Sequence, residues 1–304
     1  MKKYMNMKNY LIIIASLTCL SFVSCDKNED KNEYNTADDG KVLSRPGVKR
    51  ASDGHLYYIL DNNSVMLTRP IQGDSDFDAW NNMTSYDFLE RVEIDGKVYA
   101  VTHIDDNTFG GCTSLRSITI PEGVVNIGLE AFMDCSSLVS ITLPSSLEKL
   151  GVLSFVGCSS LTSLTVLSKK LNASLNTFQK LDHLASLKLC CHEIGMSTFS
   201  NYPELTEVFL KDGVEIIGSG AFGGCEKLKL VDLPASIKTI NPQVFERCPM
   251  LTDVYCRTSE VLDITDDVFE WNLSDNLTLH VPSDLLNAYK AHRAWGRFHQ
   301  IVAI

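Results

Sequence analysis

The segment Ile127–Val139, which reads IGLEAFMDCSSLV, decides the fold of this chain because nearly the same string returns throughout the region between Ile104 and Trp271. A fixed period of about 20 to 50 residues is the signature of a repeat architecture. The intervals between the aromatic positions of successive copies are 23, 23, 23, 21, 23, 23 and 24 residues. These positions are Phe109, Phe132, Phe155, Phe178, Phe199, Phe222, Phe245 and Phe269.

Each copy continues from its phenylalanine in the same way. The third residue after it is Cys112, Cys135, Cys158, Leu181, Tyr202, Cys225 or Cys248, and a leucine follows about three residues later. Polar and apolar residues then alternate, as in Leu115-Arg-Ser-Ile-Thr-Ile-Pro121. This two-residue period predicts a short strand that ends at a turn proline.

A unit of 23 residues cannot bury both faces of so short a strand by itself. Neighbouring copies must therefore stack and share one continuous apolar interior. The sequence predicts a mainly β repeat solenoid with the phenylalanines inside it. Binding across an extended surface is the natural use of such a shape, whereas catalysis usually needs one unusual site.

The pattern IGxxAFxxCxSLxxIxLPxxVxxIG, present in Ile104–Gly128, Ile127–Gly151 and Ile217–Ile240, resembles the BspA-type leucine-rich repeat of bacterial cell-surface lipoproteins. The resemblance covers roughly Ile104 to Pro282, with degenerate copies at Phe178 and Phe269. It implies a right-handed array with short strands and short helical or turn segments. It also implies a surface protein that binds host or matrix proteins or other cells, without identifying the ligand.

The N-terminus is typical of an exported lipoprotein. Residues 1–24 predict a signal peptide, with three lysines before an apolar core, Tyr10–Leu17, that is too short to span a bilayer. Cys25 follows Phe22-Val-Ser and resembles a lipobox cysteine, although Phe22 stands where leucine is usual. Lipidation of Cys25 would anchor the chain to the outer membrane. Ordinary cleavage with release, or an incidental cysteine, are the alternatives.

Residues 25–52 predict the lipidated cysteine and a flexible tether, because Asp26–Glu33 is charged and almost free of apolar residues. An acidic stretch behind a lipidated cysteine also resembles the export signal of surface-displayed lipoproteins; a periplasm-facing position is the alternative. The chain has a net charge of -11, and 27 basic residues less the three leader lysines leave 24 against 38 acidic ones, or about -14. Such a chain is a poor partner for nucleic acid.

The predicted repeat array spans residues 103–281, and its two open ends must be covered by caps. Residues 53–102 predict an N-terminal β cap of two hairpins, His55–Leu60 with Val65–Thr68 and Phe88–Ile94 with Lys97–Val101; Asp95-Gly96 is a strong turn signal between the second pair. Residues 282–304 predict a C-terminal cap: a helix capped by Ser283 or Asp284 and ended by Gly296, then an extended segment from Phe298.

Two segments depart from the regular pattern. Residues 70–86 are interpreted as a solvated acidic loop, because Asp74-Ser-Asp-Phe-Asp78 lacks the glycine and glutamate of a calcium loop. Between Val166 and Glu193 the proline turn is lost and the Phe178 copy lacks its cysteine, which predicts a bend or a bulged coil.

Several motifs that suggest chemistry have a structural explanation. Gly218–Gly223 satisfies GxGxxG, but it is in register with the turns at Gly128 and Gly151. The repeated cysteines are interpreted as buried, unpaired thiols. Cys190-Cys191-His192 is unsuited to a metal, since adjacent strand residues point to opposite faces. The sequence contains no GxSxG, HExxH or phosphate loop. We therefore expect no catalytic residue, cofactor or metal.

The outward residues of the strands are the candidate ligand surface. The first copies present Arg116, Thr119, Thr142 and Thr165. The later copies present aromatic and charged residues of the kind that anchor interfaces. These weaker candidates are Glu207, Phe209, Lys229, Asp232, Asp253, Tyr255 and Arg257. Packing of Phe209 and Tyr255 on neighbouring strands is the alternative explanation.

The sequence thus favours a non-catalytic, lipid-anchored surface protein whose solenoid binds a protein or glycoconjugate, in the manner of an adhesin. The alternative is a structural or accessory envelope lipoprotein that docks to another membrane component of the same cell. An enzyme would require a cleft with convergent titratable groups.

Overall fold

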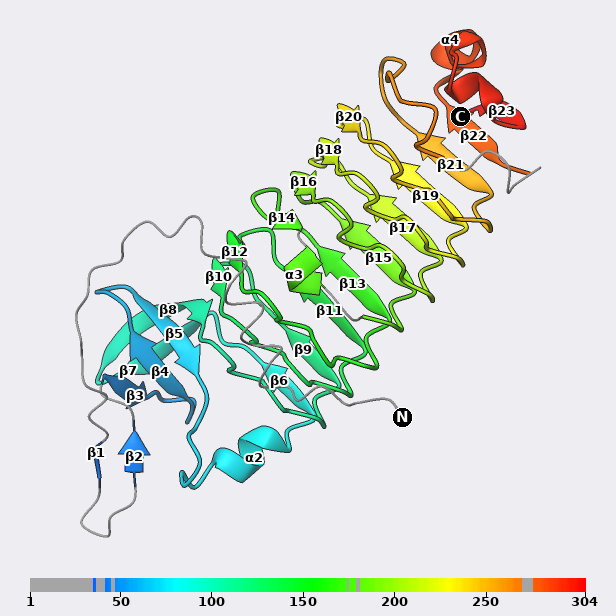
Figure 1. Cartoon of the computed structure of the whole chain (residues 1–304). Coiled ribbons are helices and arrows are strands. Elements are labelled where there is room, and N and C mark those ends of the chain that lie inside the picture. Colours follow the sequence, from blue (N-terminus) through cyan, green and yellow to red (C-terminus); the bar gives the residue numbers. More distant parts are fainter. Residues whose placement is uncertain (1–34, 37–41, 45–46, 174, 179–180, 270–275) are drawn as a thin grey trace, which may run out of the picture.

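The computed structural model of the chain describes residues 35–36, 42–44, 47–173, 175–178, 181–269 and 276–304. The predicted signal peptide and Cys25 lie outside the described residues. The chain forms a mainly β solenoid in which successive coils follow one another in a line from the N-terminal cap to the C-terminal cap (Figure 1). This confirms the predicted fold class.

One row of parallel strands runs along the solenoid. Its strands pair in register at the repeat interval, so that Ser140, Ser163, Ser186 and Glu207 are neighbours. Inward and outward side chains alternate along each strand, as the two-residue period predicts. Strands β6 (Ser85–Asp87) and β9 (Ser117–Thr119) pair only with each other. The other strands form one sheet: β11 (Ser140–Leu143), β13 (Ser163–Val166), β15 (Ser186–Leu189), β17 (Glu207–Leu210), β19 (Leu230–Leu233), β21 (Asp253–Cys256), β22 (Thr278–Val281) and β23 (Gln300–Ala303).

A second row of two-residue strands forms where each coil turns back after its proline. The row is divided into two groups, because β12 pairs only with β10 whereas β14 begins a new sheet. Its strands are β10 (Asn126–Ile127), β12 (Lys149–Leu150), β14 (Asn172–Ala173), β16 (Glu193–Ile194), β18 (Ile216–Ile217) and β20 (Thr239–Ile240). The division falls in the predicted irregular segment, where the short helix α3 (Leu175–Phe178) replaces a turn.

The repeated phenylalanines form a continuous stack inside the solenoid. All eight rings are at most 3% exposed. Neighbouring ring centroids lie 5.3 to 6.0 Å apart, and the planes of Phe109, Phe132 and Phe155 are parallel to within 2°. Each ring therefore contacts the coil before it and the coil after it, which buries apolar surface that one coil cannot bury alone.

The cysteine of each copy does more than fill space. The Cys135 thiol donates to the carbonyl of Phe109 in the previous coil, with Sγ and O 3.1 Å apart. Cys158 and Cys225 repeat this bond to Phe132 and Phe199. At the Phe199 copy, the Tyr202 hydroxyl donates to Phe178 instead. A weak S–H donor thus satisfies a buried backbone carbonyl, which explains why this position prefers cysteine and accepts tyrosine.

Close approach between coils explains the repeated glycine. A Cβ on Gly151 would lie 2.3 Å from the carbonyl oxygen of Gly128, and one on Gly218 would lie 2.6 Å from the amide nitrogen of Met196. The first glycine of the GxGxxG string is therefore required by the packing of two turns. No strand-turn-helix unit follows it in the described residues around Gly218.

The predicted N-terminal hairpins are present. β4 (Leu56–Ile59) pairs with β5 (Ser64–Thr68), and β7 (Arg91–Ile94) pairs with β8 (Lys97–Ile104). The sheet begins before residue 53, however, because β3 (Val48–Arg50) pairs with β4 and Ala51 is buried. The predicted boundary between tether and cap, at residue 52, therefore lies inside the sheet of the cap. Two further short strands, β1 (Asn35–Thr36) and β2 (Val42–Ser44), pair with each other.

The prediction of a solvated loop over residues 70–86 was wrong. The segment contains helix α2 (Phe77–Asn81) and strand β6, and Trp80 and Tyr86 are buried. Trp80 stacks on Phe109 with centroids 5.4 Å apart, and its carbonyl accepts the Cys112 thiol, so it replaces the phenylalanine of an earlier coil. The sequence concealed this coil because β6 begins only five residues after Trp80.

The C-terminal cap differs in detail from the prediction. A 3₁₀ turn, η1 (Ser283–Leu285), precedes helix α4 (Leu286–Ala291), and neither has a side-chain N-cap bond. Gly296 does not end the helix, because it lies within the 3₁₀ turn η2 (Trp295–Arg297). Helix α4 ends five residues before Gly296, and the separate turn that contains Gly296 buries Trp295. Strand β23 then extends the main row, as the predicted extended tail requires.

Replacing Phe155 with alanine should lower the free energy of unfolding by about 3–5 kcal/mol, because it removes a fully buried ring from the middle of the stack. Urea unfolding followed by circular dichroism measures the change. Thr142→Ala, on the exposed face of β11, should cost less than about 1 kcal/mol. Equal losses for the two variants would contradict the role of the stack.

The repeat thiols should resist alkylation in the folded chain. Burial raises the pKa of Cys112 to about 11 and the pKa values of Cys158 and Cys225 to about 12. A thiol with a pKa near 12 holds on the order of 1,000-fold less thiolate at about pH 8 than a free cysteine. Iodoacetamide labelling with peptide mapping should modify the half-buried Cys190 first and the other three only in urea. Labelling of Cys158 at the rate of Cys190 would contradict this.

Candidate functional site on the strand face

The outward residues at the third position of each strand form one row across the main sheet. In β17, β19, β21 and β22 this row consists of Phe209, Asp232, Tyr255 and His280, which are register neighbours. Their strands follow one another near the C-terminal end of the solenoid (Figure 1). The period of the fold, rather than proximity in sequence, therefore brings them together.

Tyr255 lies at the centre of this group. Its ring stacks on the imidazole of His280, with centroids 4.1 Å apart and planes within 8° of each other. The guanidinium carbon of Arg257 lies 5.5 Å from the same ring centroid. Stacking and cation–π attraction both restrict the tyrosine, so its exposed part is held in one orientation.

Two carboxylates hold the charged members of the group. Arg257 donates from Nε to Asp232, at 2.7 Å, and a second, longer contact of 3.4 Å joins its terminal nitrogen to the other carboxylate oxygen. His280 Nε2 lies 2.8 Å from Asp253 Oδ1, and Thr252 donates its hydroxyl to the other oxygen of Asp253. We call Asp232, Asp253, Tyr255, Arg257 and His280 the strand-face cluster.

The hydrogen bonds of the strand-face cluster favour the ionised form of Asp253. The hydrogen bond from His280, with a smaller one from Thr252, lowers the pKa of Asp253 below its ordinary value. A lowered folded-state pKa stabilises the fold above the ordinary carboxyl pKa of about 3.9, and this contribution is lost as the pH falls through the lowered value. Asp253 therefore keeps its negative charge at neutral and mildly acidic pH.

The structure brings together Asp232, Asp253, Tyr255 and Arg257 among the predicted surface residues. Phe209 is half-buried beside Asp232 and has Lys211 over its ring at 5.7 Å, while Glu207 is exposed at the first position of β17. Lys229 is exposed but lies just before β19, because Leu230 is the register neighbour of Glu207 and Asp253. The strand starts one residue later than the alternation in this copy suggests.

The remaining outward candidates lie in earlier coils. Thr142 and Thr165 are register neighbours in β11 and β13, Thr119 lies in β9, and Arg116 precedes β9. This half of the face presents hydroxyl groups and has no counterpart of the strand-face cluster among its described residues.

The sequence interpretation missed the place of His280. Leu279-His-Val-Pro282 has the same alternation and final proline as Ile141-Thr-Leu-Pro144, and this was the available signal. It was hidden because 25 residues separate Tyr255 from His280, against 23 between Asp232 and Tyr255.

The residues of the other motifs make contacts with nearby residues or lie in separate environments. Asp74 accepts the amide of Ile71, and Asp76 pairs with Arg50. Cys190 is half-buried and Cys191 is buried, so the two thiols lie in different environments. Among the described residues, no group of three or more histidine, cysteine or acidic side chains is placed to hold a metal ion.

Comparison with known families agrees with the repeat architecture. The profile described as "BspA type Leucine rich repeat region" matches six copies, over residues 82–201 and 192–287. The chain belongs to this family. The match begins at residue 82, just after Trp80, and so includes most of the coil that lacks the repeat phenylalanine. BspA-type repeats therefore extend from the N-terminal cap to helix α4.

Solved structures similar to this BspA-type chain are themselves leucine-rich repeat proteins. One from T. pallidum is 23% identical and covers 76% of this chain and 81% of its own, with a TM-score of 0.39. One from Bacteroides ovatus is 17% identical, with 82% and 97% covered and a TM-score of 0.34. A leucine rich cell surface protein from Faecalibacterium prausnitzii is 15% identical, with 82% and 93% covered and a TM-score of 0.26. The comparison with curated proteins gave no match.

Substituting His280 with alanine should raise the pKa of Asp253 towards its ordinary value, because the largest favourable hydrogen bond to the carboxylate is lost. Carboxyl-carbon NMR titration measures the shift directly. Thr252→Val should raise the pKa less, since its contribution is smaller. A larger effect from Thr252 than from His280 would contradict the assignment.

Proposed function

We propose that this protein is a non-catalytic cell-surface lipoprotein whose solenoid binds a protein or glycoconjugate through the strand-face cluster. The observation that carries the proposal is the connection of Asp232, Arg257, Tyr255, His280 and Asp253 by stacking and charged hydrogen bonds. Tyrosine and arginine are enriched among residues that dominate binding energy at interfaces.

Preorganisation supports this role. Binding normally loses free energy when mobile side chains become fixed, at about 0.5–1.5 kcal/mol for each immobilised side chain. Here the orientations of Tyr255 and Arg257 are already restricted by His280 and Asp232. The charged groups also remain partly accessible, since the side chains of Arg257 and Asp253 are 48% and 38% exposed.

The rest of the face supports recognition over an extended area. The row continues through Phe209 and Lys188 into the hydroxyl-bearing strands of the earlier coils. A ligand with several contact points, such as a protein surface or a branched glycan, fits a row of this kind better than a small molecule does. The repeated architecture supplies this area.

The proposed location follows from the N-terminus. A lipid on Cys25 and the polar segment behind it would place the solenoid outside the outer membrane at the end of a tether. The helices among the described residues include none that is long and apolar enough to cross a membrane. The proposed anchor is the lipid on Cys25.

Binding to extracellular-matrix proteins and glycan arrays should be lost when Tyr255→Ala and Arg257→Ala are combined. The expected loss is at least about tenfold in affinity, because hot-spot residues contribute about 2 kcal/mol or more. Thr142→Ala, on the same face in an earlier coil, is the matched control and should bind like the unchanged chain. Binding that survives the double variant would overturn the assignment of the site.

The alternative is an envelope lipoprotein that docks to a component of its own cell. Protease treatment of intact cells separates the two functions, because an outward-facing solenoid is accessible to the protease. A chain that stays uncut, and that co-purifies with an envelope component through Tyr255 and Arg257, would favour the alternative.

A further inference from the structure

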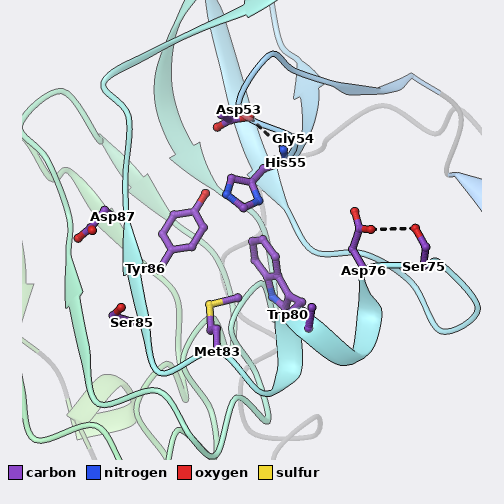
Figure 2. A pocket seen from close by; sticks show the side chains of 11 residues that line it. Asp53, Gly54, His55, Ser75, Asp76, Trp80, Met83, Ser85, Tyr86 and Asp87 are labelled. Atoms are coloured by element: carbon purple, nitrogen blue, oxygen red, sulfur yellow. Dashed lines mark hydrogen bonds between the residues drawn. The ribbon is translucent and has the colours of Figure 1, made fainter.

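A second site lies at the opposite end of the solenoid, where the N-terminal cap meets the first coil. It is a pocket of about 420 Å³ that opens between the turn before β4, helix α2 and strand β6 (Figure 2). No local sequence pattern indicates this pocket, because its three segments meet only when the coil at Trp80 is folded. It is independent of the strand-face cluster, which is built from β19, β21 and β22.

Aromatic rings form the floor of this pocket, where His55 is half-buried and Trp80 and Tyr86 are 4% and 5% exposed. His55, Trp80 and Tyr86 line it, with ring centroids 5.1 to 5.6 Å apart from one another. The indole nitrogen of Trp80 donates to the carbonyl of Thr108, so its polar atom is already used. The thioether side chain of Met83 adds a polarizable surface beside these rings (Figure 2).

Carboxylates surround the rings. Asp53, Asp76 and Asp87 come from the three separate segments and lie on different sides of the pocket (Figure 2). Neither lysine nor arginine is among the residues that line it. Arg50 neutralises one of the three carboxylates through its ion pair with Asp76.

The two other carboxylates differ in the hydrogen bonds that they make. Asp53 accepts hydrogen bonds from the His55 amide and the Tyr57 hydroxyl, which hold it in place. Asp87 is exposed in β6, and its side chain makes no hydrogen bond or ion pair with the described residues. One carboxylate is therefore fixed, and the other is available to a ligand.

We propose that this pocket binds an alkylammonium group. Aromatic rings attract a cation within about 6 Å of their centroids, and this attraction strengthens when water is partly excluded. Carboxylates on several sides favour the same charge. The hydroxyls of Ser75 and Ser85 and the free oxygens of Asp87 provide acceptors for ammonium hydrogens.

A neutral ligand uses this arrangement less well. A sugar would contact the rings and the hydroxyls, but the excess negative charge would gain no partner from it. An anion would be repelled by the same carboxylates. The charge of the pocket therefore selects for a cation, and the rings select for a cation with an apolar body.

Titration of the ¹⁵N-labelled full chain with butylammonium chloride and with choline chloride tests the proposal. The indole N–H signal of Trp80 is the reporter, and 3,3-dimethyl-1-butanol is the neutral isostere of choline. We expect one or both cations to shift the Trp80 signal saturably and the neutral alcohol to leave it in place. A shift by butylammonium alone would indicate a primary amine, as on a lysine side chain, and a shift by choline would indicate a quaternary head group.

Two variants locate the bound cation. Asp87→Asn should weaken binding about threefold, because it removes one partly exposed charge. Asp95→Asn makes the same change of charge at the exposed turn between β7 and β8, outside the pocket, and should have no effect. Ser85→Lys places a competing ammonium at the rim and should weaken binding more than tenfold.

The spectra of the variants also report whether the cap stays folded. The proposal is overturned if neither cation shifts Trp80, if the neutral alcohol or a neutral sugar shifts it equally, or if Asp87→Asn and Asp95→Asn behave alike in folded protein. Its failure would leave the strand-face proposal intact, because no residue is shared between the two sites.

Discussion

The stacking of phenylalanine rings between successive coils is the contact on which the rest of the structure depends. Each ring contacts its equivalents about 5.5 Å before and after it, so every coil must repeat at nearly the same length. The thiol-to-carbonyl bond from Cys135 to Phe109, and its equivalents, fixes the same turn by satisfying a buried backbone group. The repeat period is therefore a consequence of packing.

The stack also determines what the two ends must contain. Trp80 continues it at the N-terminal end, and Trp295 and Phe298 cover Phe269 at the C-terminal end with tilted or edge-on rings. Because the end rings would otherwise face water, each cap supplies a large aromatic side chain whose indole nitrogen donates to a backbone carbonyl. The caps have different secondary structures but the same physical task.

Because the interior and the caps are fixed by the stack, the outward residues of the main sheet are free to vary. Inward positions of the strands are fixed by the stack, whereas outward positions are hydroxyl-bearing in the early coils and aromatic or charged in the later ones. The strand-face cluster and the pocket at Trp80 lie at different ends of the array. Both lie where the repeat is irregular: the interval between Tyr255 and His280 is longer than usual, and the coil at Trp80 is shorter.

The sequence by itself determined the solenoid, the buried phenylalanines, the hairpins of the cap and most of the strand-face cluster, because each rests on a period or a turn signal that is local in the chain. It did not determine the coil at Trp80, the neighbour of Tyr255, the exact register of Lys229 or the end of helix α4. Those depend on contacts between segments whose spacing departs from the period. Only the tertiary structure decides them, since the stacking energy of a ring such as Trp80 can override the length and pattern of the segment that carries it.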